Sequence, residues 1–306
     1  MDFSDLGRAL GEVYEECRPM IGQGKLADYI PELARVDPNQ FGLCLHMNDG
    51  TTFAYGDTKV PFSIQSISKV LVLAMILPKI APCFDRVHVE PSGDPFNSLV
   101  QLEYEDGVPR NPFINAGALV TTDMLIGLEA DPKQAILKFL TRLNRGRIVH
   151  FNDLVARSEI LHASRNRSLA YLMHSFRNIK SEVEYLIDVY SHQCAVQMSL
   201  QELTRSFAFL ANGGLSPTTG EQVLSRGDSK RINALMVTCG FYDESGEFAY
   251  RVGLPGKSGV GGGIVTVLPG RFTLAAFSPG LNAKGNSLVG MRALEMFTAR
   301  TSASLF

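Results

Sequence analysis

One stretch of the sequence, from position 62 to position 77, reads Phe62-Ser63-Ile64-Gln65-Ser66-Ile67-Ser68-Lys69 followed by Val70-Leu71-Val72-Leu73-Ala74-Met75-Ile76-Leu77. A helix that is apolar on every side is a buried helix, so the second half predicts a helix inside the core. Ser66 and Lys69 would then lie one turn apart on the same face, at the N-terminus of that helix. We interpret the rest of the chain from this stretch.

Ser66 and Lys69 have the residue types of a nucleophile and its base. A serine hydroxyl is a weak nucleophile until a neighbouring base removes its proton. A lysine acts as that base only when its pKa is lowered, and burial near the positive end of a helix dipole lowers it. Ser66 is the only serine with a lysine three positions later. The alternative for this motif alone is an N-cap serine followed by a lysine that reaches solvent.

A second motif, Lys257-Ser258-Gly259, lies in the glycine-rich stretch from 256 to 263. A phosphate-binding P-loop would need glycine five residues before Gly256, but Arg251 occupies that position. The motif fits a strand at the edge of a serine site, with glycines that allow backbone N–H groups to approach a ligand. A glycine-rich bend between two strands is the alternative.

The hydrophobic period changes along the chain. Residues 3–18 predict an amphipathic helix, and alternation around Asn48-Asp49-Gly50 predicts a hairpin over 40–55. From Asn115 to Leu210 the pattern is helical. Strand patterns return at 248–252, 263–268 and 271–278, and a last helix is expected over 287–300. The chain therefore predicts an α/β fold in which both ends form a sheet around a helical insertion, with the cleft at their junction.

Three helix starts are marked within the helical region. Asp131-Pro132 predicts an N-cap followed by proline at the first helical position. Ser181-x-x-Glu184 and Ser199-x-x-Glu202 both have the capping-box pattern. The helix after Ser199 is expected to run to Asn212.

Composition excludes several classes of protein. The 306 residues carry 29 Lys and Arg against 31 Asp and Glu, so no basic field favours nucleic acid or an anionic membrane. The longest apolar run is far shorter than the ~20 residues of a membrane span, and the N-terminus has no signal-peptide pattern. Five scattered cysteines and six dispersed histidines predict reduced thiols and no metal site. We expect a soluble, cytoplasmic protein without metal or cofactor.

The order of the two motifs resembles the serine β-lactamase and penicillin-binding protein fold. Ser-x-x-Lys near one end and Lys-Ser-Gly near the other flank a helical insertion, as in that fold. This resemblance implies an antiparallel sheet flanked by helices. The middle motif of those proteins, Ser-Asp-Asn or Tyr-x-Asn, is absent. The nearest segment is Tyr190-Ser191-His192-Gln193.

Four separated segments together resemble the serine-dependent glutaminase family: 29–34 (YIPELA), 65–69 (QSISK), 111–118 (NPFINAGA) and 257–260 (KSGV). The resemblance extends from about Tyr29 to the C-terminal helix. It implies hydrolysis of L-glutamine to L-glutamate and ammonia through a Ser66 acyl-enzyme, with Lys69 as general base. It also implies an oxyanion hole formed by the backbone N–H groups of Ser66 and Val260. Tyr190 is implied as the proton relay to the leaving ammonia, with Tyr29 lining the same pocket.

The resemblance also implies a set of substrate contacts. Glu159 would pair with the α-ammonium group, and the neutral polar contacts would come from Tyr29, Gln65, Asn115, Asn166 and Tyr242. Taken singly, several of these have ordinary structural alternatives. Glu159 fits a solvated carboxylate, Asn115 fits a backbone contact at a helix start, and Tyr242 fits a packed aromatic with its hydroxyl in water.

The resemblance implies one catalytic domain over 1–306, with a helical subdomain at roughly 110–215. It implies a homodimer or homotetramer of the short bacterial form, since no mitochondrial leader or ankyrin repeat is present in the sequence. Two alternatives remain open at this point. One is another serine hydrolase of the penicillin-recognising fold, and the other is a binding protein that retains this fold without catalysis.

Overall fold

The structure is a computed structural model that describes residues 3–80, 83–92 and 99–306. Its main sheet has five strands in the order β2-β1-β8-β7-β6, and every neighbouring pair is antiparallel. The strands are β1 (Gly42–Met47), β2 (Thr52–Gly56), β6 (Gly256–Ser258), β7 (Gly263–Leu268) and β8 (Phe272–Phe277). The two ends of the chain thus share one sheet, as the sequence predicts.

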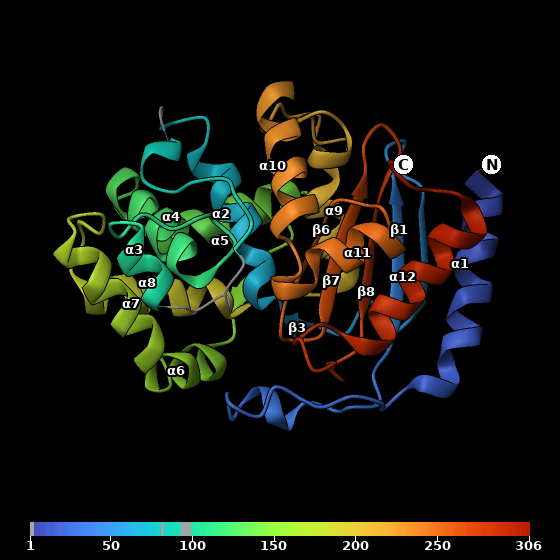
Figure 1. Cartoon of the computed structure of the whole chain (residues 1–306). Coiled ribbons are helices and arrows are strands. Elements are labelled where there is room, and N and C mark those ends of the chain that lie inside the picture. Colours follow the sequence, from blue (N-terminus) through green and yellow to red (C-terminus); the bar gives the residue numbers. More distant parts are fainter. Residues whose placement is uncertain (1–2, 81–82, 93–98) are drawn as a thin grey trace.

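Helices cover both faces of this sheet (Figure 1). On one face lie α1 (Phe3–Cys17) and α12 (Leu288–Thr301), which pack against each other. On the other face α9 (Leu200–Ala211) packs against β1, β7 and β8. Because side chains alternate along a strand, Leu274 and Ala276 point into the first layer, while Ala275 and Phe277 point into the second. The central strands are therefore buried along their whole length.

The middle of the chain forms a helical region beside the sheet (Figure 1). Its elements are α3 (Leu99–Tyr104), α4 (Asn115–Leu128), α5 (Pro132–Leu143), α6 (Asp153–Leu161), α7 (Ser164–Ser175) and α8 (Val183–Cys194). The chain also contains α10 (Arg226–Cys239) and α11 (Ser245–Arg251). The predicted apolar helix is α2 (Ser68–Ile76), which is buried at every position and packs against α4 and α10. It connects the helical region to the sheet side of the molecule.

A second, three-stranded sheet was not predicted by the hydrophobic pattern. Its order is β3-β5-β4, with β3 (Phe62–Ser63), β4 (His150–Phe151) and β5 (Val196–Met198). Strands of two or three residues are too short to show an alternating pattern, so the region from Asn115 to Leu210 looks wholly helical in the sequence. This small sheet ties the segment before Ser66 to the end of α8.

Two sequence predictions of local structure are wrong. The expected strand at 248–252 lies instead in helix α11 (Ser245–Arg251) and its C-cap residue Val252. Phe248 and Val252 are four residues apart, which brings both to one side of the helix, where they are buried. The expected N-cap at Ser181 is instead Glu182, whose carboxylate accepts hydrogen bonds from the backbone N–H groups of Glu184 and Tyr185.

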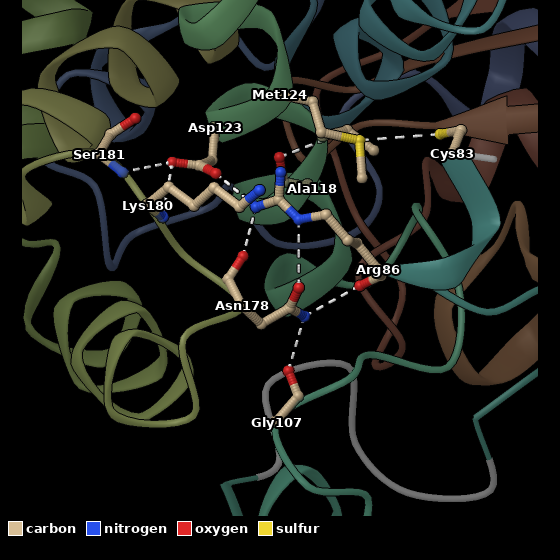
Figure 2. A network of polar contacts seen from close by, with 10 residues as sticks. Cys83, Arg86, Gly107, Ala118, Asp123, Met124, Asn178, Lys180 and Ser181 are labelled. Carbon is tan, nitrogen blue, oxygen red and sulfur yellow. Dashed lines mark hydrogen bonds and ion pairs between the residues drawn. The ribbon is translucent and has the colours of Figure 1, made fainter. Parts of the chain in front are cut away.

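A polar network explains why Ser181 does not cap the helix (Figure 2). The backbone N–H groups of Lys180 and Ser181 donate to the Asp123 carboxylate of α4, at 3.1 and 2.7 Å. Asp123 also pairs with Arg86, and the Asn178 side chain donates to the carbonyls of Arg86 and Gly107. The segment that leads into α8 is thus held by hydrogen bonds to Asp123 of α4, and through Asn178 to Arg86 and Gly107.

The other predicted helix starts are confirmed. Asp131 accepts a hydrogen bond from the Gln134 N–H, with Pro132 at the first position of α5. Ser199 and Glu202 form a complete capping box at α9, whose C-cap residue is Asn212. The hairpin and the first and last helices also lie within one or two residues of the expected bounds.

Candidate active site

A cavity of about 180 Å³ lies where the start of α2, the start of α4, the helices α6 to α8 and the loops after α10 and β6 meet. All nine residues expected to contact the substrate line it. The complete lining is Tyr29, Ile30, Gln65, Ser66, Asn115, Glu159, His162, Arg165, Asn166, Tyr190, Cys194, Tyr242 and Val260. Residues that are far apart in the sequence therefore share one small space.

Ser66 lies on a tight 3-10 turn, Gln65–Ile67 (η3), directly before α2. Gln65 has a φ of +51°, a left-handed conformation that a residue with a side chain adopts only when its surroundings hold it. The Gln65 amide donates to the Ser63 hydroxyl at 2.9 Å, and Ser63 donates to the Cys194 carbonyl at 2.9 Å. The turn that presents Ser66 is therefore fastened to the end of α8.

The loop after β6 approaches this turn closely. A Cβ atom added to Gly259 would lie 2.5 Å from the Ile64 carbonyl oxygen, and one added to Gly261 would lie 2.2 Å from that of Ser63. Only glycine fits at these two positions, because a side chain would collide with backbone. The backbone of Val260 is thereby held beside the Ser66 turn. The predicted oxyanion hole, formed by the N–H groups of Ser66 and Val260, requires this proximity.

Lys69 is fully buried on α2, and its hydrogen bonds go to neutral oxygens. Its Nζ donates to Asn115 Oδ1 at 2.7 Å and to the Phe113 carbonyl at 3.3 Å. Burial lowers the pKa of Lys69 to about 8, while the charge of Glu159 partly opposes this shift. A lysine in this environment gives up its proton near neutral pH, which an exposed lysine does not.

The amide of Asn115 links Lys69 to the far side of the cavity. Its Nδ2 donates to Asn166 Oδ1 at 3.1 Å, while its Oδ1 accepts from Lys69. The expected alternative, a backbone contact at the helix start, is made instead by Asn111, which accepts from the N–H groups of Phe113 and Ile114. The Asn115 side chain is thereby available to the cavity.

Glu159 lies in the last turn of α6 and is not an ordinary solvated carboxylate. Burial raises its pKa to about 7, while the hydrogen bond from Gln65 and the positive charge of Lys69 oppose that shift. Because burial disfavours the carboxylate form, a cation bound beside Glu159 would stabilise it. Glu159 is thus suited to pairing with a positively charged group in the cavity.

Three tyrosines surround the cavity at different depths. Tyr190 on α8 is buried, and burial raises its pKa well above the usual value, so its hydroxyl keeps its proton. Burial raises the pKa of Tyr242 to about 12, and an interaction with the Ser66 side chain partly opposes this shift. Tyr29 is 58% exposed and lies at the rim. Tyr190 and Tyr242 are therefore the inner hydroxyl groups.

Sequence reasoning missed four cavity residues: Ile30, His162, Arg165 and Cys194. Cys194 could have been found from its position four residues after Tyr190, which places both on one face of α8. His162 and Arg165 lie between Glu159 and Asn166 in the sequence, and the short connection from α6 to α7 brings them to the same wall.

Lys257 was part of a recognised motif but had no assigned role. Its side chain is fully buried, and Nζ donates to the Ser258 and Gly240 carbonyls at 2.8 and 3.0 Å. The same atom lies 4.7 Å from the centroid of the Tyr242 ring. Burial, together with the nearby charge of Lys69, lowers the pKa of Lys257 well below its usual value. The Lys257 side chain thus packs against the face of the Tyr242 ring.

Two negative findings apply to the described part of the chain. Across residues 3–80, 83–92 and 99–306, no group of three or more His, Cys, Asp or Glu side chains is arranged to hold a metal ion. Over the same ranges, every helix is too short or too polar to cross a membrane.

The sequence is similar to known proteins along almost its whole length. The sequence model of the family described as Glutaminase matches residues 24–306. A curated relative from Vibrio cholerae, named Glutaminase, is 50% identical over 97% of this chain and 98% of its own length. A solved structure described as a probable glutaminase is 36% identical, with a TM-score of 0.93 over 100% of this chain and 99% of that one. A probable glutaminase from Bacillus subtilis, solved in complex with 6-diazo-5-oxo-L-norleucine, is 34% identical with a TM-score of 0.86, over 96% of this chain and 94% of that one.

Proposed function

The chain belongs to the glutaminase family and hydrolyses L-glutamine, and on that premise we propose that the reaction runs through an acyl-enzyme on Ser66. Lys69 is the base that takes the hydroxyl proton. The observation that carries this proposal is the environment of Lys69, fully buried and hydrogen-bonded to two neutral oxygens, which favours its uncharged form. General-base assistance of this kind is worth ~10²–10⁴-fold in rate.

The first half of the reaction forms the ester. The Ser66 oxygen attacks the side-chain amide carbon of glutamine, and its proton passes to Lys69. The backbone N–H groups of Ser66 and Val260 hold the negative oxygen of the tetrahedral intermediate, and the loss of one such donor costs ~10²–10³-fold in kcat. The carbon–nitrogen bond then breaks, and Tyr190 donates a proton to the leaving group, which departs as ammonia. Lys69 returns a proton to Tyr190.

The second half restores the enzyme. Water attacks the ester carbon as Lys69 takes its proton, and the bond to the Ser66 oxygen breaks. The proton returns to Ser66, and L-glutamate leaves. The same base thus acts in both halves, as microscopic reversibility favours.

The charged end of the substrate lies on the opposite wall. Glu159 pairs with the α-ammonium group, and its raised pKa supports a role in which a bound cation stabilises the carboxylate. The remaining polar contacts come from Gln65, Asn115, Asn166 and the hydroxyls of Tyr29 and Tyr242, all of which line the cavity. These groups orient the side-chain amide toward Ser66.

The test combines turnover with covalent labelling. Ammonia release is measured with L-glutamine, L-asparagine and no substrate, and nitrocefin hydrolysis is measured in parallel for a penicillin-recognising hydrolase. The protein is then incubated with 6-diazo-5-oxo-L-norleucine, and the modified peptide is identified by mass spectrometry. Glutamine-dependent ammonia release with labelling at Ser66 is the expected result. A label on another residue, or turnover of nitrocefin alone, would overturn the mechanism.

We also propose a cytoplasmic homodimer or homotetramer in which residues 1–306 form one catalytic domain, with the helical subdomain at roughly 110–215. The five cysteines are free and buried, which suits a reducing compartment. Light scattering after size-exclusion chromatography measures the assembly, and a monomer at micromolar concentration would contradict it.

A further inference from the structure

Tyr242 has an unfavourable backbone conformation at the wall of the cavity. Its φ is +53°, a left-handed value that is uncommon for a residue with an aromatic side chain. It opens the short 3-10 turn Tyr242–Glu244 (η5) between α10 and α11. Because such a conformation persists only where neighbouring contacts hold it, the contacts of this turn determine where the Tyr242 hydroxyl lies.

The strongest of these contacts are made by Glu244, two residues further on. Its carboxylate oxygens accept from Asn282 Nδ2 at 3.1 and 3.0 Å, and one of them also accepts from Asn286 Nδ2 at 2.5 Å. The same Asn286 amide donates to the Phe241 carbonyl at 3.4 Å. The residues on both sides of Tyr242 are therefore bonded to one loop, residues 282–286.

The 282–286 loop has a fixed shape. Asn282 Oδ1 accepts from the N–H groups of Lys284 and Asn286 at 2.9 and 3.1 Å, and the Asn282 N–H donates to the Asn286 carbonyl at 2.8 Å. The Asn286 side chain is fully buried. The loop thus presents two amide groups to Glu244 as a unit.

This loop also lies beside the site itself. Gly285 has no side chain, and a Cβ atom added to it would lie 3.8 Å from the Tyr242 ring and 3.9 Å from the Val260 side chain, so little more than the space of a methyl group separates them. The loop therefore lies beside Tyr242, whose side chain interacts with that of Ser66, and beside Val260, whose N–H belongs to the proposed oxyanion hole.

The charge of Glu244 suits this role. Its neighbours Glu247 and Glu295 form ion pairs with Arg251 and Arg292, whereas the contacts of Glu244 resolved in the described chain are to neutral amides. A carboxylate accepts several hydrogen bonds at once, and bonds to a charged acceptor are stronger than bonds to a neutral one. A glutamine in its place would direct an NH₂ group at another NH₂ group.

We propose that Glu244 is a positioning residue for the hydrolysis of glutamine. Through Asn282 and Asn286 it fixes the 282–286 loop to the turn that carries Tyr242, and thereby sets the position of the Tyr242 hydroxyl relative to Ser66. This inference rests on the Ser66 mechanism proposed above. It adds a residue about which neither the sequence motifs nor the lining of the cavity gives any indication.

The first experiment measures kcat and KM of Glu244→Gln with L-glutamine. Glu247→Gln, at an exposed position of the neighbouring helix α11, is the matched control and should retain both constants. We expect Glu244→Gln to lower kcat by about tenfold or more, because a displaced Tyr242 hydroxyl no longer aligns with Ser66 and the substrate amide, and to raise KM as well, because Tyr242 also contacts the substrate. A kcat within about twofold of the wild type would overturn the proposal.

The second experiment restores the contact with the roles reversed. Asn282→Asp keeps the oxygen that organises the loop but directs a carboxylate at Glu244, so alone it should also lower kcat. In Glu244→Gln/Asn282→Asp the new amide donates to the new carboxylate, and most of kcat should return. Losses that simply add would show that the pair does not act as a unit. If Glu244→Gln does not fold, Asn282→Asp and the double variant give the same answer.

The third experiment separates positioning from general stabilisation. In a Tyr242→Phe background the hydroxyl is already absent, so Glu244→Gln should lower kcat much less than it does in the wild type. An equal loss in both backgrounds would contradict the proposal. Labelling of Ser66 by 6-diazo-5-oxo-L-norleucine in the wild type is scored independently. An unlabelled Ser66 refutes the mechanism itself, whereas a labelled Ser66 with a fully active Glu244→Gln refutes only the positioning role.

Discussion

The Nζ of Lys69 lies 2.7 Å from the Oδ1 of Asn115. An amide oxygen is an acceptor without net charge, so this contact orients the lysine without holding it in the charged form. A carboxylate at the same distance would strongly favour the ammonium form. Asparagine at position 115 therefore favours the neutral form of Lys69, which the proposed general-base role requires.

Replacing Asn115 by aspartate should move the pH dependence of the enzyme. The new negative charge raises the pKa of Lys69 above its value of about 8, so the rise of kcat/KM should shift to higher pH. Asn115→Ala, which lacks the charge, is the control and should lose activity without such an alkaline shift. Equal midpoints for Asn115→Asp and the wild type would show that this residue does not set the protonation of Lys69.

Ser66 and Lys69 should behave as one unit in mutant kinetics. Ser66→Ala and Lys69→Ala should each lower kcat by roughly 10²–10⁴-fold or more, and the double variant should be little worse than either alone. Circular dichroism and thermal unfolding check that each variant is folded. Substantial glutaminase activity in Ser66→Ala would exclude Ser66 as the nucleophile.

The pH profile of kcat/KM should show two ionisations. In the proposed mechanism Glu159, with a pKa of about 7, must be deprotonated to hold the ammonium group, and Lys69, with a pKa of about 8, must be neutral to act as base. Both requirements are lost as the pH falls, so log kcat/KM should rise with a slope of two below about pH 7, one up to about pH 8, and then level off. In Glu159→Gln the limiting slope should fall to one. A profile that is flat from pH 5 to 9, with chemistry limiting, would contradict both assignments.

Burial of Lys69 should also appear in stability. Its folded pKa of about 8 lies below the ordinary value of 10.5, so the unfolded chain binds one more proton between these two pH values. Stability of the wild type relative to Lys69→Met should therefore rise with pH across this window, by about 1.4 kcal/mol per pH unit, and be constant below it. Denaturant unfolding of both proteins between pH 7 and pH 10 measures the difference. If the difference in unfolding free energy between the two proteins stays constant across this range, the pKa of Lys69 is not lowered in the folded protein.

The sequence predicted the elements that have strong local patterns. The apolar octapeptide after Lys69 has no polar position, so a helix formed by it had to be buried, and α2 is buried throughout. The capping box at Ser199 succeeded because both of its hydrogen bonds are local to one helical turn. Predictions of this kind depend on neighbours within about four residues.

The two local predictions that are wrong depended on residues outside the predicted segments. Ser181 satisfies the capping pattern, but Asp123, 58 residues away in the chain, takes its backbone N–H. Residues 248–252 alternate as a strand does, yet Phe248 stacks on Phe241 with ring centroids 3.6 Å apart, in a helix. Tertiary contacts decided both cases, and no local pattern contains them.

In the candidate site, too, some residues could be predicted from the sequence and others only from the structure. The family resemblance named nine residues that line one cavity, because matched positions identify residues without any knowledge of the path between them. Five of the nine lie in the four motifs, and the other four are Glu159, Asn166, Tyr190 and Tyr242. It gave no role to Lys257 or to Glu244. Lys257 contacts the Tyr242 ring, and Glu244 accepts hydrogen bonds from the 282–286 loop. Supporting residues of this kind are recognised by their contacts, which only the structure provides.

Substrate recognition by Glu159 can be separated from its other effects. If this carboxylate pairs with the α-ammonium group, Glu159→Gln leaves a desolvated cation without a partner, which is costly inside a pocket. The α-end is then misplaced, and with it the amide at Ser66, so most of kcat/KM for L-glutamine should be lost.

The comparison that isolates this role uses two substrates. An analogue of glutamine that lacks the α-amino group should be a poor substrate for the wild type, because it leaves the Glu159 carboxylate buried and unpaired. The same analogue should suffer much less from Glu159→Gln than L-glutamine does, since it has no ammonium group to lose contact. The four kcat/KM values give the coupling between the carboxylate and the ammonium directly. If the mutation reduces turnover of both substrates by the same factor, Glu159 does not bind the ammonium group, and its raised pKa of about 7 reflects burial in a structural position instead.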